Sequence, residues 1–84
     1  MYDSNNIDLI YLSPYVEINK KNQSIIFYNY IFNTILKVER FEDIINDLNK
    51  GIEFKKLKEK LEERFGSSEA ELLINKLIIN GVIE

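Results

Sequence analysis

The order of segments in the chain predicts an α+β fold, in which a three-stranded antiparallel sheet comes first and three helices follow. In the first half, short runs rich in β-branched and aromatic residues alternate with polar turns. In the second half, apolar residues recur at spacings of three and four, which is typical of amphipathic helices. At 84 residues the chain is long enough for one small domain. We expect residues 1–10 to form a flexible N-terminus and residues 11–84 to form the folded unit.

Turn signals bound the expected strands. The first strand covers residues 12–19, with Pro14, which cannot donate to a ladder, at its start or on an edge. A polar turn leads to the second strand, residues 24–29. Asn29 and Asn33 then bracket a short apolar stretch, and asparagine tolerates left-handed turn geometry. Residues 34–38 form the third strand, and hairpin connections make the sheet antiparallel.

Three helical patterns follow the strands. The first is an apolar stripe that begins at Phe41 and ends before Gly51, and the second is a stripe formed by Phe54, Leu57 and Leu61. Ser68 precedes Glu71 by three residues, which predicts a capping box at the start of the third helix. We expect the third helix to end at Gly81, after which residues 82–83 fold back over the core.

The third helix has apolar residues on two sides. At about 100° per residue, Ala70, Leu73, Ile74 and Leu77 form the core side, whereas Leu72 and Ile79 fall nearly opposite. Isolated apolar residues are common on protein surfaces, so the second side can be an ordinary surface. The alternative is that Leu72 and Ile79, with Asn75 and Lys76 between them, form one wall of a groove for a partner.

The third strand would form the opposite wall. One outer strand of a three-strand meander leaves a row of unpaired backbone groups, to which an extended peptide can add as a further strand. Leu36 and Val38 share one face, whereas Ile35 and Lys37 lie on the other. Lys37 can also simply blunt this edge, as charged residues on edge strands often do.

The chemical inventory argues against catalysis. The chain contains no histidine, cysteine or tryptophan, and its three glycines are scattered singly. It therefore lacks the usual general base, the thiol nucleophile, the commonest metal ligands and a glycine-rich phosphate loop. We expect no enzyme activity, no cofactor and no metal. The absence of cysteine, of a signal peptide and of a transmembrane span favours the cytoplasm and no membrane partner.

Four stretches carry a resemblance to a known family: residues 11–18 (Tyr-Leu-Ser-Pro-Tyr-Val-Glu-Ile), residues 44–51, residues 57–61 and the ending at residues 77–83 (Leu-Ile-Ile-Asn-Gly-Val-Ile). They resemble the PqqD-like precursor-peptide recognition domains, whose fold is a winged helix-turn-helix. The resemblance covers residues 10–84 as a pattern of hydrophobic spacing rather than a signature motif. Winged-helix transcription factors share much of the second half.

The resemblance implies a non-catalytic protein in the biosynthesis of ribosomally made, post-translationally modified peptides. Such domains bind the leader segment of a precursor peptide as a strand added to their third strand. They present it to a radical SAM enzyme, a cyclodehydratase, a dehydratase or a protease. Lys37, Arg40 and Lys76 would pair with acidic leader residues. The implied peptide-binding residues are Thr34, Ile35, Leu36, Lys37, Val38, Leu72, Asn75, Lys76 and Ile79.

Two other functions compete with peptide recognition. A DNA-binding winged helix would insert its third helix into the major groove, which requires a basic face. From residue 69 to residue 84 there is one lysine against three glutamates, and the net charge of the chain is −3, so we expect no nucleic-acid partner. The other alternative is a protein-interaction module, including a homodimer formed by pairing of edge strands.

Overall fold

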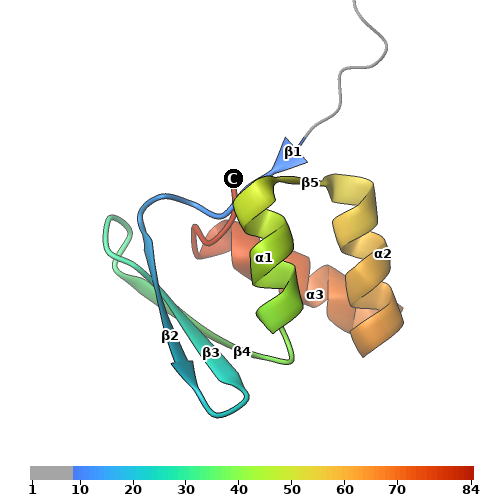
Figure 1. The fold of residues 1–84 in the computed structure, drawn as a ribbon, viewed down its shortest axis with the longest axis horizontal. Coiled ribbons are helices and arrows are strands. Elements are labelled where there is room, and N and C mark those ends of the chain that lie inside the picture. The colour runs from blue at the N-terminus through green and yellow to red at the C-terminus, as the bar shows by residue number, and fades with distance from the viewer. Residues whose placement is uncertain (1–8) are drawn as a thin grey trace, which may run out of the picture.

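The computed structural model describes residues 9–84 and confirms an α+β fold with a three-stranded antiparallel sheet and three helices (Figure 1). A short two-stranded ladder accompanies the main sheet. The strands are β1 (Leu9–Ile10), β2 (Val16–Lys21), β3 (Ser24–Asn29), β4 (Thr34–Glu39) and β5 (Ile52–Glu53). The helices are α1 (Glu42–Lys50), α2 (Phe54–Phe65) and α3 (Ser67–Ile79).

The main sheet is a meander with the order β2-β3-β4, so β3 is central and β4 is an outer strand. Val16 pairs with Asn29, and Asn29 in turn pairs with Thr34. Asn33, in the loop before β4, has a φ of 59°, as expected for an asparagine in a left-handed turn. Side chains alternate along β4, with Val38 buried on the core face and Ile35 exposed on the other face.

The N-terminal part of the fold corrects two predictions. Leu9 and Ile10, expected in a flexible N-terminus, pair with β5 as β1, whereas residues 1–8 of that prediction lie outside the described residues. The next strand begins at Val16 rather than at residue 12. The reason is that residues 11–13 bond to the C-terminus instead, with the Ser13 N–H donating to the Val82 carbonyl over 2.8 Å.

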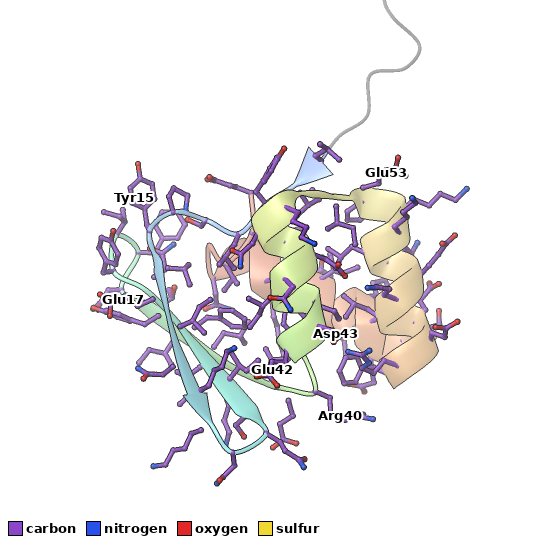
Figure 2. The ribbon with its side chains drawn as sticks, viewed as in Figure 1. Tyr15, Glu17, Arg40, Glu42, Asp43 and Glu53 are labelled. Carbon is purple, nitrogen blue, oxygen red and sulfur yellow. The ribbon has the colours of Figure 1, made fainter. Side chains whose placement is uncertain are left out.

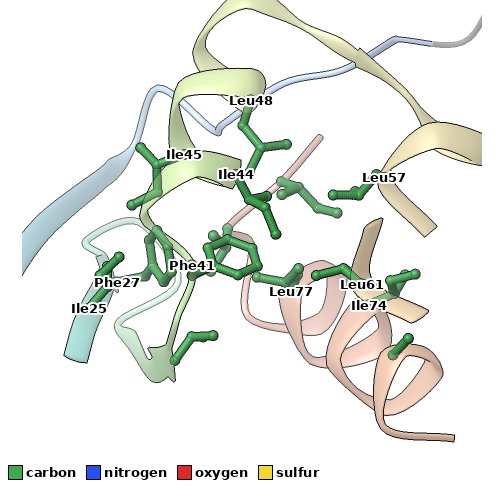
Figure 3. Packing of buried hydrophobic residues seen from close by; sticks show 14 residues of the cluster. Ile25, Phe27, Phe41, Ile44, Ile45, Leu48, Leu57, Leu61, Ile74 and Leu77 are labelled. Atoms are coloured by element: carbon green, nitrogen blue, oxygen red, sulfur yellow. The ribbon is translucent and has the colours of Figure 1, made fainter. Parts of the chain in front are cut away.

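The three helices enclose a core with the inner face of the sheet (Figure 3). Phe27 of β3 meets Phe41 edge-to-face, with ring centroids 5.8 Å apart, and both side chains are fully buried. Leu57 and Leu61 of α2 are buried as predicted, but Phe54, the first residue of the helix, is 41% exposed. These large apolar side chains provide most of the burial that stabilises so small a domain.

Helix α3 departs from the sequence prediction at its N-terminal end only. The helix begins at Ser67 after Gly66 and has no side-chain cap, so the predicted capping box of Ser68 and Glu71 does not form. At the other end, Gly81 adopts a φ of 68° and turns the chain, and the Val82 N–H donates to the Leu77 carbonyl over 2.8 Å. Val82 and Ile83 then fold back into the core as predicted.

None of the helices in residues 9–84 combines the length and the apolar character needed to cross a membrane.

Candidate functional site

The outer edge of β4 is free within residues 9–84, because no strand pairs with it on the side away from β3. In an antiparallel ladder, alternate residues of an outer strand direct their N–H and C=O groups away from the sheet. β4 therefore presents unpaired backbone donors and acceptors along six residues. Such an edge can accept a further strand.

Helix α3 runs alongside this edge in the opposite chain direction. At one end, the hydroxyl of Thr34 donates to the Asn80 carbonyl over 2.7 Å and joins the start of β4 to the end of α3. At the other end, the guanidinium carbon of Arg40 lies 4.9 Å from the centre of the Phe65 ring, just before α3 begins. β4 is thus bonded to the end of α3 at one end, and the turn after β4 contacts the end of α2 at the other.

A groove of about 210 Å³ lies between β4 and α3, near the Arg40 end. Its floor is apolar, because Val38 is buried and Leu73 is half-buried, whereas Leu72 at its edge is 54% exposed. The lining comes from both elements and from the end of α2: Lys37, Val38, Glu39, Arg40, Phe65, Glu69, Leu72, Leu73 and Lys76.

The residues expected from the sequence divide into two groups. Lys37, Val38, Leu72 and Lys76 line the groove, whereas Thr34, Ile35, Leu36, Asn75 and Ile79 do not. Thr34 is engaged with α3, and Leu36 is half-buried against the core. Ile35 lies on the outer face of the sheet, and Asn75 is exposed on α3 beyond the groove.

Helix α3 turns a different row of residues toward β4 than the one expected. The row is Glu69, Leu73, Lys76 and Asn80, spaced by four, three and four residues, which is a helical stripe. Sequence reasoning assigned Leu73 wholly to the core and missed Glu69. It also missed Phe65 as a groove residue. The amphipathic pattern fixes which side is most buried, but not how far the helix rotates relative to one strand.

Three cations surround the groove. Lys37, Arg40 and Lys76 form no ion pair with any carboxylate of residues 9–84. Of the two carboxylates in the lining, Glu39 accepts a hydrogen bond of 3.4 Å from the Ser24 hydroxyl on the outer face of the sheet. The three cations exceed the two carboxylates, Glu39 and Glu69, by one, so the rim of this end carries a small excess of positive charge.

A neighbouring ion pair holds Arg40 in place. Arg64 of α2 donates to both carboxylate oxygens of Asp43, over 2.7 and 2.8 Å, and to the Arg40 carbonyl over 2.9 Å. The Arg64 guanidinium lowers the pKa of Asp43 to about 2. Figure 2 shows Arg40 and Asp43 close together where β4 leads into α1. This pair fixes the turn, in which Arg40 has a φ of 55°.

The opposite end of β4 is mostly apolar. Residues 28–36 and 77–83 contain no charged side chain, and the fold brings these two stretches together. Phe32 and Ile78 line a neighbouring hollow of about 300 Å³, whose lining also includes Tyr15 and Glu84 and no residue of β4. The side chains of Phe32 and Ile78 are 59% and 53% exposed, and Ile79 is 74% exposed. Exposed apolar side chains gathered in this way are typical of interaction surfaces.

Asn29 organises this apolar end. Its side-chain amide donates to the Gly81 carbonyl over 2.8 Å, and its side-chain oxygen accepts from the N–H groups of Ile31 and Phe32 over 2.9 and 2.8 Å. The Asn29 side chain is almost fully buried. Asn29 therefore fixes both the conformation of the β3–β4 loop and the distance between this loop and the end of α3. The sequence position of Asn29, between strand and loop, did not reveal this role.

Within residues 9–84, no group of three or more acidic side chains could hold a metal ion. Comparisons of the chain with protein-family models, with curated proteins and with solved structures found no match. What the site can do therefore has to be argued from its geometry. An open strand edge beside a groove with an apolar floor and a charged rim offers backbone hydrogen bonds and side-chain contacts to an extended polypeptide.

Proposed function

We propose that the chain is a winged helix-turn-helix domain that binds an extended peptide by strand addition to β4. The observation that carries the proposal is the free edge of β4 beside a preformed groove against α3. The role is non-catalytic recognition. The peptide is the leader segment of a ribosomally made precursor, which the domain presents to a modifying enzyme.

The geometry suits a strand rather than a helix or a compact ligand. A strand added to β4 would place alternate side chains on the core face, next to Leu72 and Leu73, and the others beside Ile35 and Lys37. Main-chain hydrogen bonds would supply affinity for any extended chain. The apolar groove would supply selectivity for the side chain placed in it.

Preorganisation supports the same function. The bond between Thr34 and Asn80 ties β4 to the end of α3, and the bond between Arg64 and Arg40 ties the turn after β4 to α2, both without a ligand. A peptide that enters such a groove loses its own conformational freedom, but the domain loses little. This lowers the cost of binding a short segment.

Charge disfavours DNA as the occupant of this surface. The exposed residues of α3 include Glu69 and Glu71 against the single Lys76. A recognition helix in the major groove needs cations for phosphate contacts, and each missing contact removes part of the binding free energy. The lysines of α2 are interspersed with glutamates and lie on another element.

The assignment to leader peptides rests on the resemblance of residues 10–84 to precursor-peptide recognition domains. It leads to a direct test. Isotope-labelled protein is titrated with the leader segment of the precursor encoded beside its gene. We expect amide shifts in residues 34–39 and in residues 69–76. Saturating leader peptide that leaves these amides unmoved would contradict the proposal.

A pair of variants tests the groove itself. Leu72→Glu places a charge at the apolar edge of the groove and should weaken binding by about tenfold, since burying an unpaired charge is costly. Leu9→Glu is the matched control, because Leu9 is also a partly exposed leucine and lies on β1, away from the groove. Equal loss of affinity in both variants would indicate a general effect on the fold, which far-ultraviolet circular dichroism and thermal unfolding would detect.

A further inference from the structure

The surface along β4 has two chemically different ends. Around the Arg40 end lie Lys37, Arg40 and Lys76, none paired with a carboxylate of residues 9–84. Around the Thr34 end lie the exposed side chains of Ile35, Phe32 and Ile79, within two stretches that contain no charge. Figure 2 shows Arg40 at one end of the sheet and Tyr15, beside the β3–β4 loop, at the other.

We infer that this polarity sets the direction and the composition of the bound peptide: acidic side chains in its N-terminal part and aliphatic or aromatic side chains in its C-terminal part. The inference rests on the proposed function, because it concerns a strand added to β4. β4 runs from its apolar end at Thr34 to its cationic end at Glu39. An antiparallel partner, the more stable arrangement per residue, would therefore begin at the cationic end.

The charges at the cationic end favour an acidic partner. The lining holds three cations against two carboxylates, Glu39 and Glu69, and the Ser24 hydroxyl holds the Glu39 carboxylate toward the outer face of the sheet. Arg40 keeps its position over Phe65 because Arg64 and Asp43 hold the turn beneath it. A peptide carboxylate beside Lys37 and Lys76 would meet attraction with little reorganisation.

The apolar end favours apolar side chains for a different reason. The loop that carries Phe32 is held by Asn29 and cannot collapse onto the core, so its side chains stay exposed in the free protein. Covering Ile35, Phe32 and Ile79 removes apolar surface from water. Since β4 covers roughly 20 Å at about 3.4 Å per residue, a separation of about five residues between the two kinds of side chain would fit both ends.

The test uses two blocked synthetic peptides of identical composition. One has aspartates in its N-terminal half and isoleucines in its C-terminal half, joined by threonines, and the other has the reversed order. We expect the first to bind about fivefold more tightly or better, as measured by amide shifts of residues 34–39 during titration. In the double variant Lys37→Glu, Lys76→Glu this preference should disappear.

The control is the double variant Lys55→Glu, Lys58→Glu, which makes the same change of charge at two exposed positions of α2 outside the groove and should keep the preference. Equal affinities for the two peptides, with β4 amides shifted by both, would overturn the inference and leave strand addition intact. Tighter binding of the reversed peptide would also overturn it. If neither peptide moves the β4 amides, the proposed function fails together with the inference. Persistent dimerisation through the apolar end of β4, unaffected by peptide, would also count against the inference.

Discussion

Replacing Asn29 with alanine tests how the apolar end of the groove is built. The substitution removes three hydrogen bonds, one to the Gly81 carbonyl and two from the N–H groups of Ile31 and Phe32. It also leaves these backbone groups without a partner in a place where the Asn29 side chain excluded water. Both effects destabilise the folded state and neither changes the apolar core.

The magnitude follows from the burial of each bond. The bond to Gly81 is buried, and the two within the loop are partly buried. At about 1 kcal/mol for each of the three lost bonds, the free energy of unfolding should fall by about 3 kcal/mol. For a domain of this size, that loss lowers the melting temperature by roughly 12–24 °C.

Urea unfolding followed by circular dichroism measures this change directly. Asn75→Ala is the control, because Asn75 is exposed on α3 and its replacement should change the unfolding free energy by less than about 0.5 kcal/mol. A loss below about 1 kcal/mol for Asn29→Ala would refute the reasoning. It would mean that the loop and the end of α3 are held by apolar contacts rather than by this amide.

Two further predictions concern the turn at Arg40 and the end of α3. Arg64 lowers the pKa of Asp43 from 3.8 to about 2, so the stabilising contribution of this pair is present above about pH 4 and is lost as the pH falls toward 2. Because Asp43 is about half exposed, Asp43→Asn should cost less than about 1 kcal/mol at neutral pH, and the difference from the unchanged protein should vanish in acid unfolding curves. Gly81→Ala should destabilise by about 2–4 kcal/mol, since a Cβ there would lie 2.5 Å from the Asn29 amide nitrogen at a φ of 68°. Gly66→Ala is the control, because Gly66 has a φ of 91° but an added Cβ there meets no atom within 4 Å, and it should cost only about 1 kcal/mol. Thermal unfolding measures both variants, and equal losses of stability for Gly81→Ala and Gly66→Ala would exclude the clash at Gly81.

Local patterns predicted the elements because these depend on neighbouring residues. Alternation along residues 34–38 gave the faces of β4, and helical spacing gave the exposed positions of Leu72 and Ile79. The pairing of Leu9 with Glu53 joins residues far apart in the chain, and a two-residue strand has no periodic signal. This pairing therefore could not be predicted from the sequence.

The groove was only partly predictable for the same reason. Its general location between the third strand and third helix followed from element order. Its lining depends on the rotation of α3 about its own axis, which turns Leu73 and Glu69 toward β4 instead of Asn75 and Ile79. The contact between Arg40 and Phe65 depends on how α1, α2 and β4 meet, and this is set by packing of the whole core.

Strand addition to β4 is tested most directly with N-methylated peptides. An N-methyl group removes a backbone donor and leaves the side chain in place, so it separates main-chain pairing from groove contacts. In a bound strand, alternate N–H groups face β4 and the others face solvent. Methylation of alternate residues in one frame should therefore weaken binding by more than about tenfold, and methylation in the other frame should leave affinity nearly unchanged. Equal affinities for the two methylated peptides would contradict strand addition.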